Sequence, residues 1–219
     1  SRTFELMQLD MRREASQELW AVQDRLPRRR GMRIGLAKVF FELGDYNRSM
    51  LLVLRNYERY LERPSVNVPS DLWFLAYPQA YWDSISAYAR KYGQDPFFIA
   101  AIIREESQFA TEALSPAGAR GLMQVMPATG EWVAQAIKLP EFDRAKLFDQ
   151  LLVAAAYNAG PEAVAGWVNH HGMGADRDVF VETIPYSETR GYVKKVMRNY
   201  AEYKRLYTAR TADSLAAAP

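Results

Sequence analysis

Apolar side chains recur at helical spacing in the first part of the chain. Over residues 4–26 they do not alternate as in a strand, and Pro27 ends the pattern. The segment 31–44 repeats this pattern, and Gly44 followed by Asp45 supplies a C-cap and then an N-cap for a further helix. The pattern predicts antiparallel helix pairs with short turns, the unit of a helical hairpin repeat.

A segment rich in proline and serine follows these hairpins. From Arg63 to Asp71 the sequence RPSVNVPSD is typical of a linker, and Asp71 is placed to cap the next helix. We therefore expect helical hairpins at residues 1–70 and a second domain at residues 71–208. The tail 209–219 is expected to be disordered.

Helical signals continue through the second domain. We expect helices around Gln79–Tyr92 and at Pro96–Ser107, the latter started by an Asp95 N-cap with proline at the first helical position. After a Ser-Pro/Gly loop, the chain is expected to re-enter helix at residues 121–124 and again from Pro127. No stretch alternates well enough to predict a sheet, so the predicted fold class is all-α.

Helix punctuation also marks the last part of the chain. Gly160 can stop one helix and Pro161 can start the next, and a turn at Pro185 precedes a long terminal helix capped by Ser187. We expect side chains at the break before Gly160 to project into a cleft.

Composition excludes several functional classes. The 28 basic and 26 acidic residues give a net charge of +2, which does not favour a nucleic-acid partner. Zero cysteines exclude disulfides and thiolate chemistry. The only histidines, His170 and His171, close a helix before Gly172 and are interpreted as helix-end residues rather than a metal site. No apolar run could span a bilayer, so stable membrane insertion is not expected; Ser1-Arg2-Thr3 is no signal peptide, and we expect a processed or cut piece of a longer protein.

Two adjacent acids end the apolar helix that precedes the glycine loop. An acid at such a place suits a raised pKa and proton donation. Glu105 and Glu106 point about 100° apart on a helix, so they cannot flank one bond together. Each shares a helical face with apolar residues, so periodicity does not decide which of the two acts.

Three segments in order resemble a known family. EESQFATEALSPAGARGLMQVMPATG, AAYNAGPEAV and ETIPYSETRGYV are similar to the motifs of the soluble, Slt-type lytic transglycosylase catalytic domain, over roughly residues 75–207. The resemblance implies a lysozyme-like fold at 71–208, preceded at 1–70 by the end of an α-superhelical region. In that family the catalytic glutamate directly precedes the serine, which here is Glu106; Glu105 is then expected in solvent or in a salt bridge.

The same resemblance implies a substrate groove. Its residues are expected to be Ser115, Gln124, Met126, Tyr157, Asn158 and Glu182. Simpler roles stay open for some of the motif residues: Met126 as core, Asn158 as a helix cap, and Tyr192 as a packing residue. The sequence also departs from the family pattern, because Gln150 runs directly into Leu151 where relatives usually carry a further helical stretch.

The resemblance implies cleavage of the MurNAc-β-1,4-GlcNAc bond of peptidoglycan with formation of 1,6-anhydroMurNAc. Glu106 would act alone, first as acid and then as base, with Gln124 and Tyr157 orienting the acid and the substrate acetamido group and Ser115 offering a hydrogen bond. Alternatives are a hydrolytic muramidase on the same fold and a non-catalytic peptidoglycan-binding module.

No metal or other cofactor is expected. The implied partners are peptidoglycan glycan strands, with cell-wall synthesis or secretion-machinery proteins as further candidates, and the implied location is the periplasm. The N-terminal hairpins could instead dock a partner protein, although we expect them to brace the catalytic domain.

Overall fold

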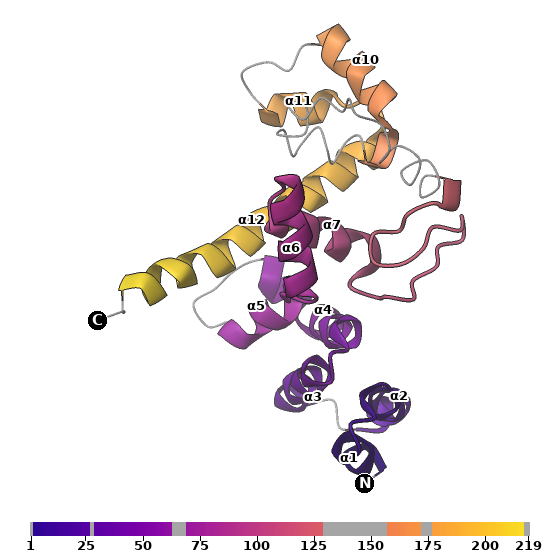
Figure 1. The fold of residues 1–219 in the computed structure, drawn as a ribbon, viewed down its shortest axis with the longest axis vertical. Coiled ribbons are helices and arrows are strands. Elements are labelled where there is room, and N and C mark those ends of the chain that lie inside the picture. The colour runs from indigo at the N-terminus through magenta and orange to yellow at the C-terminus, as the bar shows by residue number, and fades with distance from the viewer. Residues whose placement is uncertain (1, 27–28, 63–68, 129–156, 172–176, 217–219) are drawn as a thin grey trace. The chain divides into compact units, whose positions relative to one another are not determined.

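The structure is a computed structural model that describes residues 2–26, 29–62, 69–128, 157–171 and 177–216. Helices dominate these residues (Figure 1). They are α1 (Arg2–Gln8), α2 (Arg12–Val22), the short 3-10 helix η1 (Gln23–Arg25), α3 (Arg30–Glu42), α4 (Tyr46–Glu62), α5 (Ser70–Ala76), α6 (Trp82–Tyr92), α7 (Pro96–Ser107), α10 (Pro161–His171), α11 (Arg177–Thr183) and α12 (Ser187–Ala216). The described residues form isolated β-bridges but no strand, which confirms the all-α prediction.

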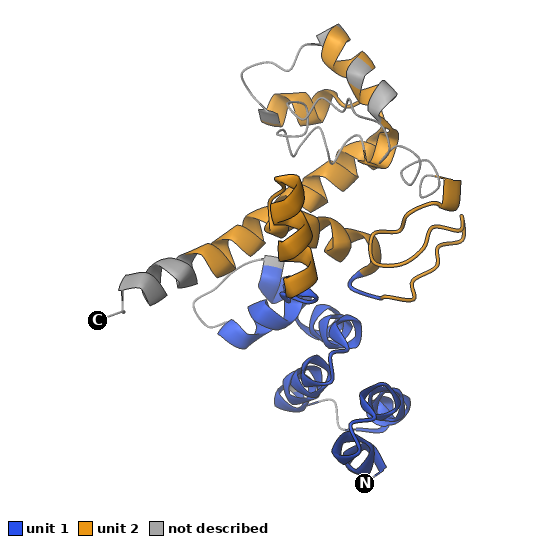
Figure 2. Cartoon of the chain, in the orientation of Figure 1, with its two compact units in different colours: residues 1–82, 108–110 blue, residues 83–107, 111–219 orange. Residues whose placement is uncertain are grey.

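The chain divides into two compact units (Figure 2). Unit 1 comprises Ser1–Trp82 together with Gln108–Ala110, and unit 2 comprises Asp83–Ser107 and Thr111–Pro219. Unit 1 therefore continues past the linker at which the sequence predicts a domain boundary, and it includes α5. The predicted linker itself lies largely at residues 63–68, outside the described residues.

The α3–α4 hairpin forms the core of unit 1. Phe40, Met50 and Val53 are completely buried in it. The predicted turn between the two helices is confirmed: Gly44 has a φ of 79°, and an Asp45 carboxylate oxygen accepts the backbone N–H of Arg48 at 3.0 Å. The glycine supplies the left-handed conformation that ends α3, and the aspartate caps α4.

The pattern predicted as one helix over residues 4–26 is two helices. Asp10 has a φ of 56°, and the N–H of Met11 donates to the carbonyl of Leu6 at 2.9 Å. This hydrogen bond ends α1 as a Schellman motif does, with aspartate tolerating the left-handed position that glycine usually occupies. Leu9 fits the helical spacing of apolar residues, so this spacing predicts one continuous helix. In the structure Leu9 is exposed and marks no buried helical face.

Three helix ends differ from the predictions. Asp71 lies within the first turn of α5 and pairs with Lys38 at 2.5 Å, so it does not cap the helix. Ser187 is the first residue of α12, and the carbonyl of Tyr186 accepts the N–H of Arg190 at 2.9 Å. α12 continues to Ala216, inside the tail predicted to be disordered, because its alanines and leucine favour helix and no proline intervenes before Pro219.

In unit 2, α7 packs along α12. The predicted bounds of α7 are confirmed, and an Asp95 carboxylate oxygen accepts the N–H of Phe97 at 2.8 Å as the expected N-cap. Inside the pair, the buried Arg104 donates to Oδ1 of Asn199 at 2.8 Å. The Tyr200 hydroxyl donates to Asp95 at 2.8 Å. These bonds fix α12 relative to the helix that carries both acids.

The other helix signals have mixed outcomes. Gly160 has a φ of 86° and Pro161 begins α10, which ends at His171 as predicted. Residues 121–124 form a turn, so the predicted re-entry into helix is wrong. Arg120 forms isolated antiparallel β-bridges with Leu114 and with Val125, so the backbone on the two sides of the turn pairs with itself. The left-handed φ of Gly121 (74°) closes the loop instead of starting a helix. The chain from 129 to 156, with the departure at Gln150, lies outside the described residues.

Among the helices described, none is both long and apolar enough to cross a bilayer. Within the same ranges, no group of three or more His, Asp or Glu side chains is arranged to hold a metal ion.

Candidate active site

The last turn of α7 presents its two acids to different residues of α12. Glu105 forms an ion pair with Lys195, with 3.0 Å between Oε1 and Nζ. Oε1 of Glu106 accepts a hydrogen bond from the Tyr192 hydroxyl at 2.7 Å. Tyr192 and Lys195 are one helical turn apart, so a single face of α12 meets both acids. Glu105 thus has the salt bridge that the resemblance implies for it.

The surroundings of Glu106 raise its pKa above the ordinary value of 4.5. Burial is the largest cause, because it penalises the charged carboxylate. The hydrogen bond from Tyr192 acts in the opposite direction, and the negative charge of Glu105 raises the pKa further. The net effect keeps a larger fraction of Glu106 protonated at a given pH than an exposed glutamate would have.

Two stacked tyrosines adjoin the acid. The rings of Tyr157 and Tyr192 lie with centroids 6.4 Å apart and planes only 5° from parallel. Burial is the main cause that raises the pKa of both hydroxyls, and the neighbouring Glu106 raises them further. Both side chains therefore stay neutral hydrogen-bond donors beside Glu106.

Tyr157 connects the acid to the glycine loop. Its hydroxyl donates to the backbone carbonyl of Met123, within the turn at residues 121–124. Tyr157 comes from the break before α10, Met123 from the loop after α7, and Tyr192 from α12. Three segments far apart in the sequence thereby meet around one carboxyl group.

Gln124 stabilises the loop from within. Its side-chain amide donates to the carbonyls of Ala113 and Gly121, at 3.2 and 2.8 Å. Its own φ is 48°, a conformation that is costly for a residue with a side chain and is compensated here by these two bonds. The described contacts of Gln124 are thus with its own loop, and the expected contact with the acid remains a prediction.

Ser115 also has a role in the loop. Its side-chain oxygen accepts the N–H of Ala119 at 3.0 Å, and its carbonyl accepts the N–H of Gly118 at 2.9 Å. The hydroxyl proton is not used by either bond and can still be donated. Met126, further along the loop, is 41% exposed and so is not the core residue that the simpler alternative expected.

The last two predicted groove residues lie near the start of α12. Oδ1 of Asn158 accepts the hydroxyl of the buried Thr189 at 2.6 Å, which ties the Tyr157 segment to α12. The carboxylate of Glu182 pairs with Lys194 at 2.6 Å, and its side chain is 63% exposed. The hydrogen bond from Lys194 is the main cause that lowers the pKa of Glu182. No described contact connects Glu182 with Glu106.

Tyr192 is absent from the predicted groove residues and has packing as its simpler role, yet its hydroxyl donates to Glu106. Helical periodicity cannot distinguish a tyrosine that packs from one that donates to a distant acid. The signal that marks Tyr192 in the sequence is its position inside the third motif, directly after Gly191.

Comparison with known families supports this reading of the motifs. Residues 83–149 match the family model described as "Transglycosylase SLT domain", and residues 183–211 match "Soluble lytic transglycosylase helical domain". The first match contains Glu106 and ends directly before Gln150, where the sequence departs from the family pattern. The second lies on α12 rather than on the N-terminal hairpins, so the superhelical assignment of residues 1–70 remains a prediction.

Curated relatives carry the same description. The soluble lytic murein transglycosylases of Salmonella typhimurium and Escherichia coli are each 33% identical over 151 residues, covering 58% of this chain and 23% of theirs. A transglycosylase of Enterobacteria phage PRD1 is 39% identical over 51 residues, covering 23% of this chain and 19% of its own. The chain thus spans about a quarter of the length of the bacterial relatives.

Solved structures extend the likeness over nearly the whole chain. The 70-kDa soluble lytic transglycosylase of Escherichia coli has a TM-score of 0.69 at 27% identity, over 93% of this chain and 35% of that one. A complex of the 70-kDa soluble lytic transglycosylase with bulgecin A has a TM-score of 0.70 at 27% identity and the same coverage. The resemblance to soluble lytic transglycosylases and the helical, lysozyme-like fold class are therefore confirmed.

Proposed function

We propose that this chain is a peptidoglycan lytic transglycosylase that cleaves the MurNAc-β-1,4-GlcNAc bond and leaves a 1,6-anhydroMurNAc end, with Glu106 as the only general acid and base. The match to the transglycosylase domain and the names of the relatives support the enzyme class. The single observation that carries the mechanism is the half-buried Glu106, with raised pKa and one oxygen bound to Tyr192.

The hydrogen bond from Tyr192 orients the acid. Because Oε1 accepts the tyrosine hydroxyl, the proton of the neutral acid belongs on Oε2, which receives no hydrogen bond from the described residues. An acid arranged in this way donates its proton from Oε2 to the glycosidic oxygen. After donation, the same tyrosine bond stabilises the carboxylate, since Tyr192 remains a neutral donor.

Neither Glu105 nor Glu182 is proposed as a second catalytic carboxylate. Common glycosidases use two carboxyl groups that flank the scissile bond. Here Glu105 is held by Lys195, and the exposed Glu182 is held by Lys194 with its pKa lowered. A single acid favours substrate assistance, in which the 2-acetamido oxygen of the muramoyl sugar stabilises the positive charge that develops at C1.

The second step returns the proton to the enzyme. The 6-hydroxyl of the muramoyl sugar attacks C1, the new C1–O6 bond closes the anhydro ring, and the hydroxyl proton passes to the Glu106 carboxylate. The glycosidic C1–O bond is broken, the GlcNAc oxygen keeps the first proton, and no water is consumed. This outcome requires the 6-hydroxyl to be held closer to C1 than any water.

Several finer assignments belong to the same proposal. Ser115, Gln124, Met126, Tyr157, Asn158 and Glu182 are proposed to contact the glycan. Peptidoglycan as substrate implies a periplasmic site of action, and proteins of cell-wall synthesis or secretion are the proposed protein partners. The relatives named soluble lytic murein transglycosylases support the peptidoglycan substrate.

Product analysis tests the proposal. Purified peptidoglycan is digested with the protein, and the released muropeptides are weighed by mass spectrometry. We expect ends that are lighter than reducing ends by one water, which identifies 1,6-anhydroMurNAc. Only water-added reducing ends would establish a hydrolytic muramidase instead. Retention of glycan strands without release of any product would establish a binding module.

A further inference from the structure

The three residues that follow α7 belong to unit 1 rather than to unit 2. Gln108–Ala110 cluster with the N-terminal helices, whereas α7 before them and the loop from Thr111 after them belong to unit 2 (Figure 2). The chain thus passes from unit 2 into unit 1 directly after Ser107. It returns to unit 2 at Thr111, at the start of the loop that carries Ser115 and Gln124.

The backbone of this segment is strained. Gln108 has a φ of 51° and Phe109 a φ of 63°. Two consecutive left-handed residues with large side chains are unfavourable and persist only where other interactions hold them. Phe109 is 2% exposed, so its burial supplies one such interaction.

Asn47 supplies another. Its side-chain amide donates to the carbonyl of Gln108 at 2.9 Å. Asn47 lies in the first turn of α4, within residues 45–48, which we call the anchor turn. Since both residues of this hydrogen bond belong to unit 1, the strained segment is fixed to that unit by a side chain as well as by burial.

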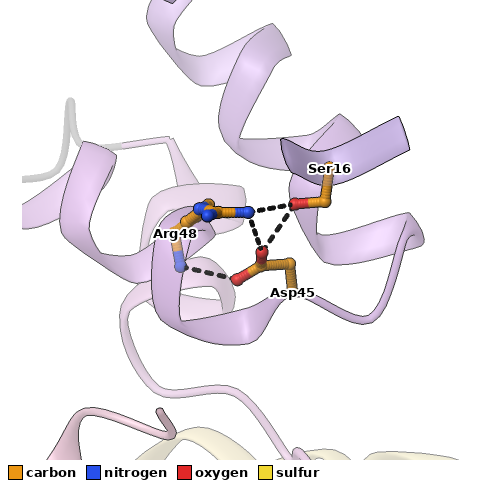
Figure 3. Close-up of polar contacts among 3 residues, drawn as sticks. All are labelled: Ser16, Asp45 and Arg48. Carbon is orange, nitrogen blue, oxygen red and sulfur yellow. Dashed lines mark hydrogen bonds and ion pairs between the residues drawn. The ribbon is translucent and has the colours of Figure 1, made fainter. Parts of the chain in front are cut away.

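Hydrogen bonds among Ser16, Asp45 and Arg48 hold the anchor turn itself (Figure 3). The hydroxyl of Ser16 donates to Asp45 at 2.6 Å. The guanidinium of Arg48 donates to Ser16 and to Asp45, at 3.0 Å each. Tyr46 packs edge-on against Phe41, with ring centroids 5.1 Å apart. Asn47 therefore lies in a turn that is held by several side-chain contacts.

The segment held by Asn47 lies between two parts of the candidate active site. Glu106 is two residues before Gln108, and the Ala113 carbonyl that accepts the Gln124 amide is a few residues after it. A change in the path of residues 108–110 must therefore move the end of α7, the start of the loop, or both. Displacement of a reacting group by about 1 Å can lower a rate on the order of a hundredfold.

We propose that Asn47 is a positioning residue, through which the N-terminal helical unit sets the geometry of Glu106 and of the loop that follows α7. The inference rests on the proposed function for its kinetic readout. Asn47 acts through the backbone carbonyl of Gln108, to which its amide donates.

Steady-state kinetics on soluble peptidoglycan oligosaccharides test the proposal. Asn47→Ala is expected to lower kcat about tenfold while KM changes less than about twofold, because the site is misaligned rather than lost. Asn47→Asp keeps the shape but replaces the amide donor by a carboxylate, so it is expected to lower kcat at least as much. Wild-type kcat in both variants would overturn the proposal.

A matched control exists on the same helix. The amide of Asn56 donates to the carbonyl of Leu52 at 2.6 Å, within α4 itself. Asn56→Ala is expected to keep the wild-type kcat. Thermal unfolding of all variants accompanies the kinetics. If kcat per folded molecule is unchanged in the Asn47 variants and only the melting temperature falls, Asn47 is merely structural and the proposal is overturned.

A readout without turnover separates this inference from the proposed function. The carboxyl carbon of Glu106 is titrated by NMR in wild type, Asn47→Ala and Asn56→Ala. Displacement of Glu106 from Tyr192 removes the hydrogen bond that lowers its pKa, so the midpoint is expected to rise in Asn47→Ala alone. Identical midpoints in the three proteins would overturn the inference, whereas an inactive wild type with the expected shift would overturn only the proposed function.

Discussion

The last turn of α7 has two sides that differ in what α12 places against them. On one side Lys195 pairs with Glu105, and on the other Tyr192 donates a hydrogen bond to Glu106. Lys195 brings a full positive charge to the carboxylate of Glu105. Tyr192 brings only a neutral hydrogen-bond donor to the half-buried Glu106, whose pKa stays raised. Two identical side chains, adjacent in sequence, thus differ in chemistry because of residues some 86 positions away.

Glu106→Gln is the largest test of this difference. The glutamine keeps the shape and the bond with Tyr192 but has no proton to donate, so kcat is expected to fall by about 10²- to 10⁴-fold. Release of soluble muropeptides from purified peptidoglycan measures the effect. Undiminished release would show that the Tyr192 side of α7 does not carry the chemistry.

The same variant is expected to be more stable than wild type at neutral pH. A raised pKa in the folded state means that the neutral acid fits the fold better than the carboxylate does. The stability that the acid contributes is present below its ordinary value of 4.5 and is lost as the pH rises through the raised folded value. Melting temperatures should therefore favour Glu106→Gln above that window and converge below it.

Tyr192→Phe removes the hydrogen-bond donor of Glu106 without changing the acid itself. The ring stack with Tyr157 is retained while the hydrogen bond to Oε1 is lost. We expect kcat to fall on the order of tenfold, as a hydrogen bond to a charged group is worth about 1.5–3 kcal/mol. The pKa of Glu106 should rise further, so the alkaline limb of the kcat/KM profile moves to higher pH. A limb that moves to lower pH would contradict the assigned direction.

Tyr157→Phe removes a bond one step further from the acid. The hydroxyl no longer holds the Met123 carbonyl, and the loop with Gln124 loses its link to the Tyr157 segment. A neutral hydrogen bond contributes about 0.5–1.5 kcal/mol, which corresponds to an expected loss of a fewfold in kcat. Hydrogen exchange at residues 121–125 should quicken in the variant. Unchanged exchange would show that this bond does not order the loop.

Glu105→Gln should have the smallest effect. Its pair with Lys195 is partly exposed, and such pairs contribute about 0–1 kcal/mol to stability. Removing the negative charge of Glu105 lowers the pKa of Glu106, so the alkaline limb should move slightly to lower pH while kcat stays within about twofold. A large loss of kcat would show that Glu105 also takes part in the reaction and would contradict the assigned difference between the two acids.

The sequence predicted the helix that carries both acids but not the difference between them. Asp95 and Pro96 mark the start of α7 by local capping chemistry, which any short window contains. The environments of Glu105 and Glu106 depend on α12, whose register against α7 is a tertiary property. Periodicity does not distinguish Glu105 from Glu106, and only the resemblance to the family motif indicates Glu106.

Local rules failed where a turn imitates a helix or interrupts one. Residues 121–124 are apolar enough to suggest a helix, yet the left-handed Gly121 and the side-chain bonds of Gln124 fold them into a turn. Asp10 breaks the first predicted helix in a conformation that composition does not reveal. The turn at residues 121–124 belongs to the candidate site. The geometry of this loop could therefore not be predicted from the sequence.

The order in which the protein is made bears on when the acid becomes competent. Glu106 meets Tyr192 across 86 residues, and the neighbouring bonds of Asn199 with Arg104 and of Tyr200 with Asp95 span 95 and 105. Contacts between residues so far apart in the sequence slow folding, because the entropy of closing the intervening loop is lost before they form. Until α12 docks, α7 carries an acid that lacks its hydrogen bond from Tyr192. Docking of α12 is therefore the step that gives Glu106 the hydrogen-bond partner on which its proposed role depends.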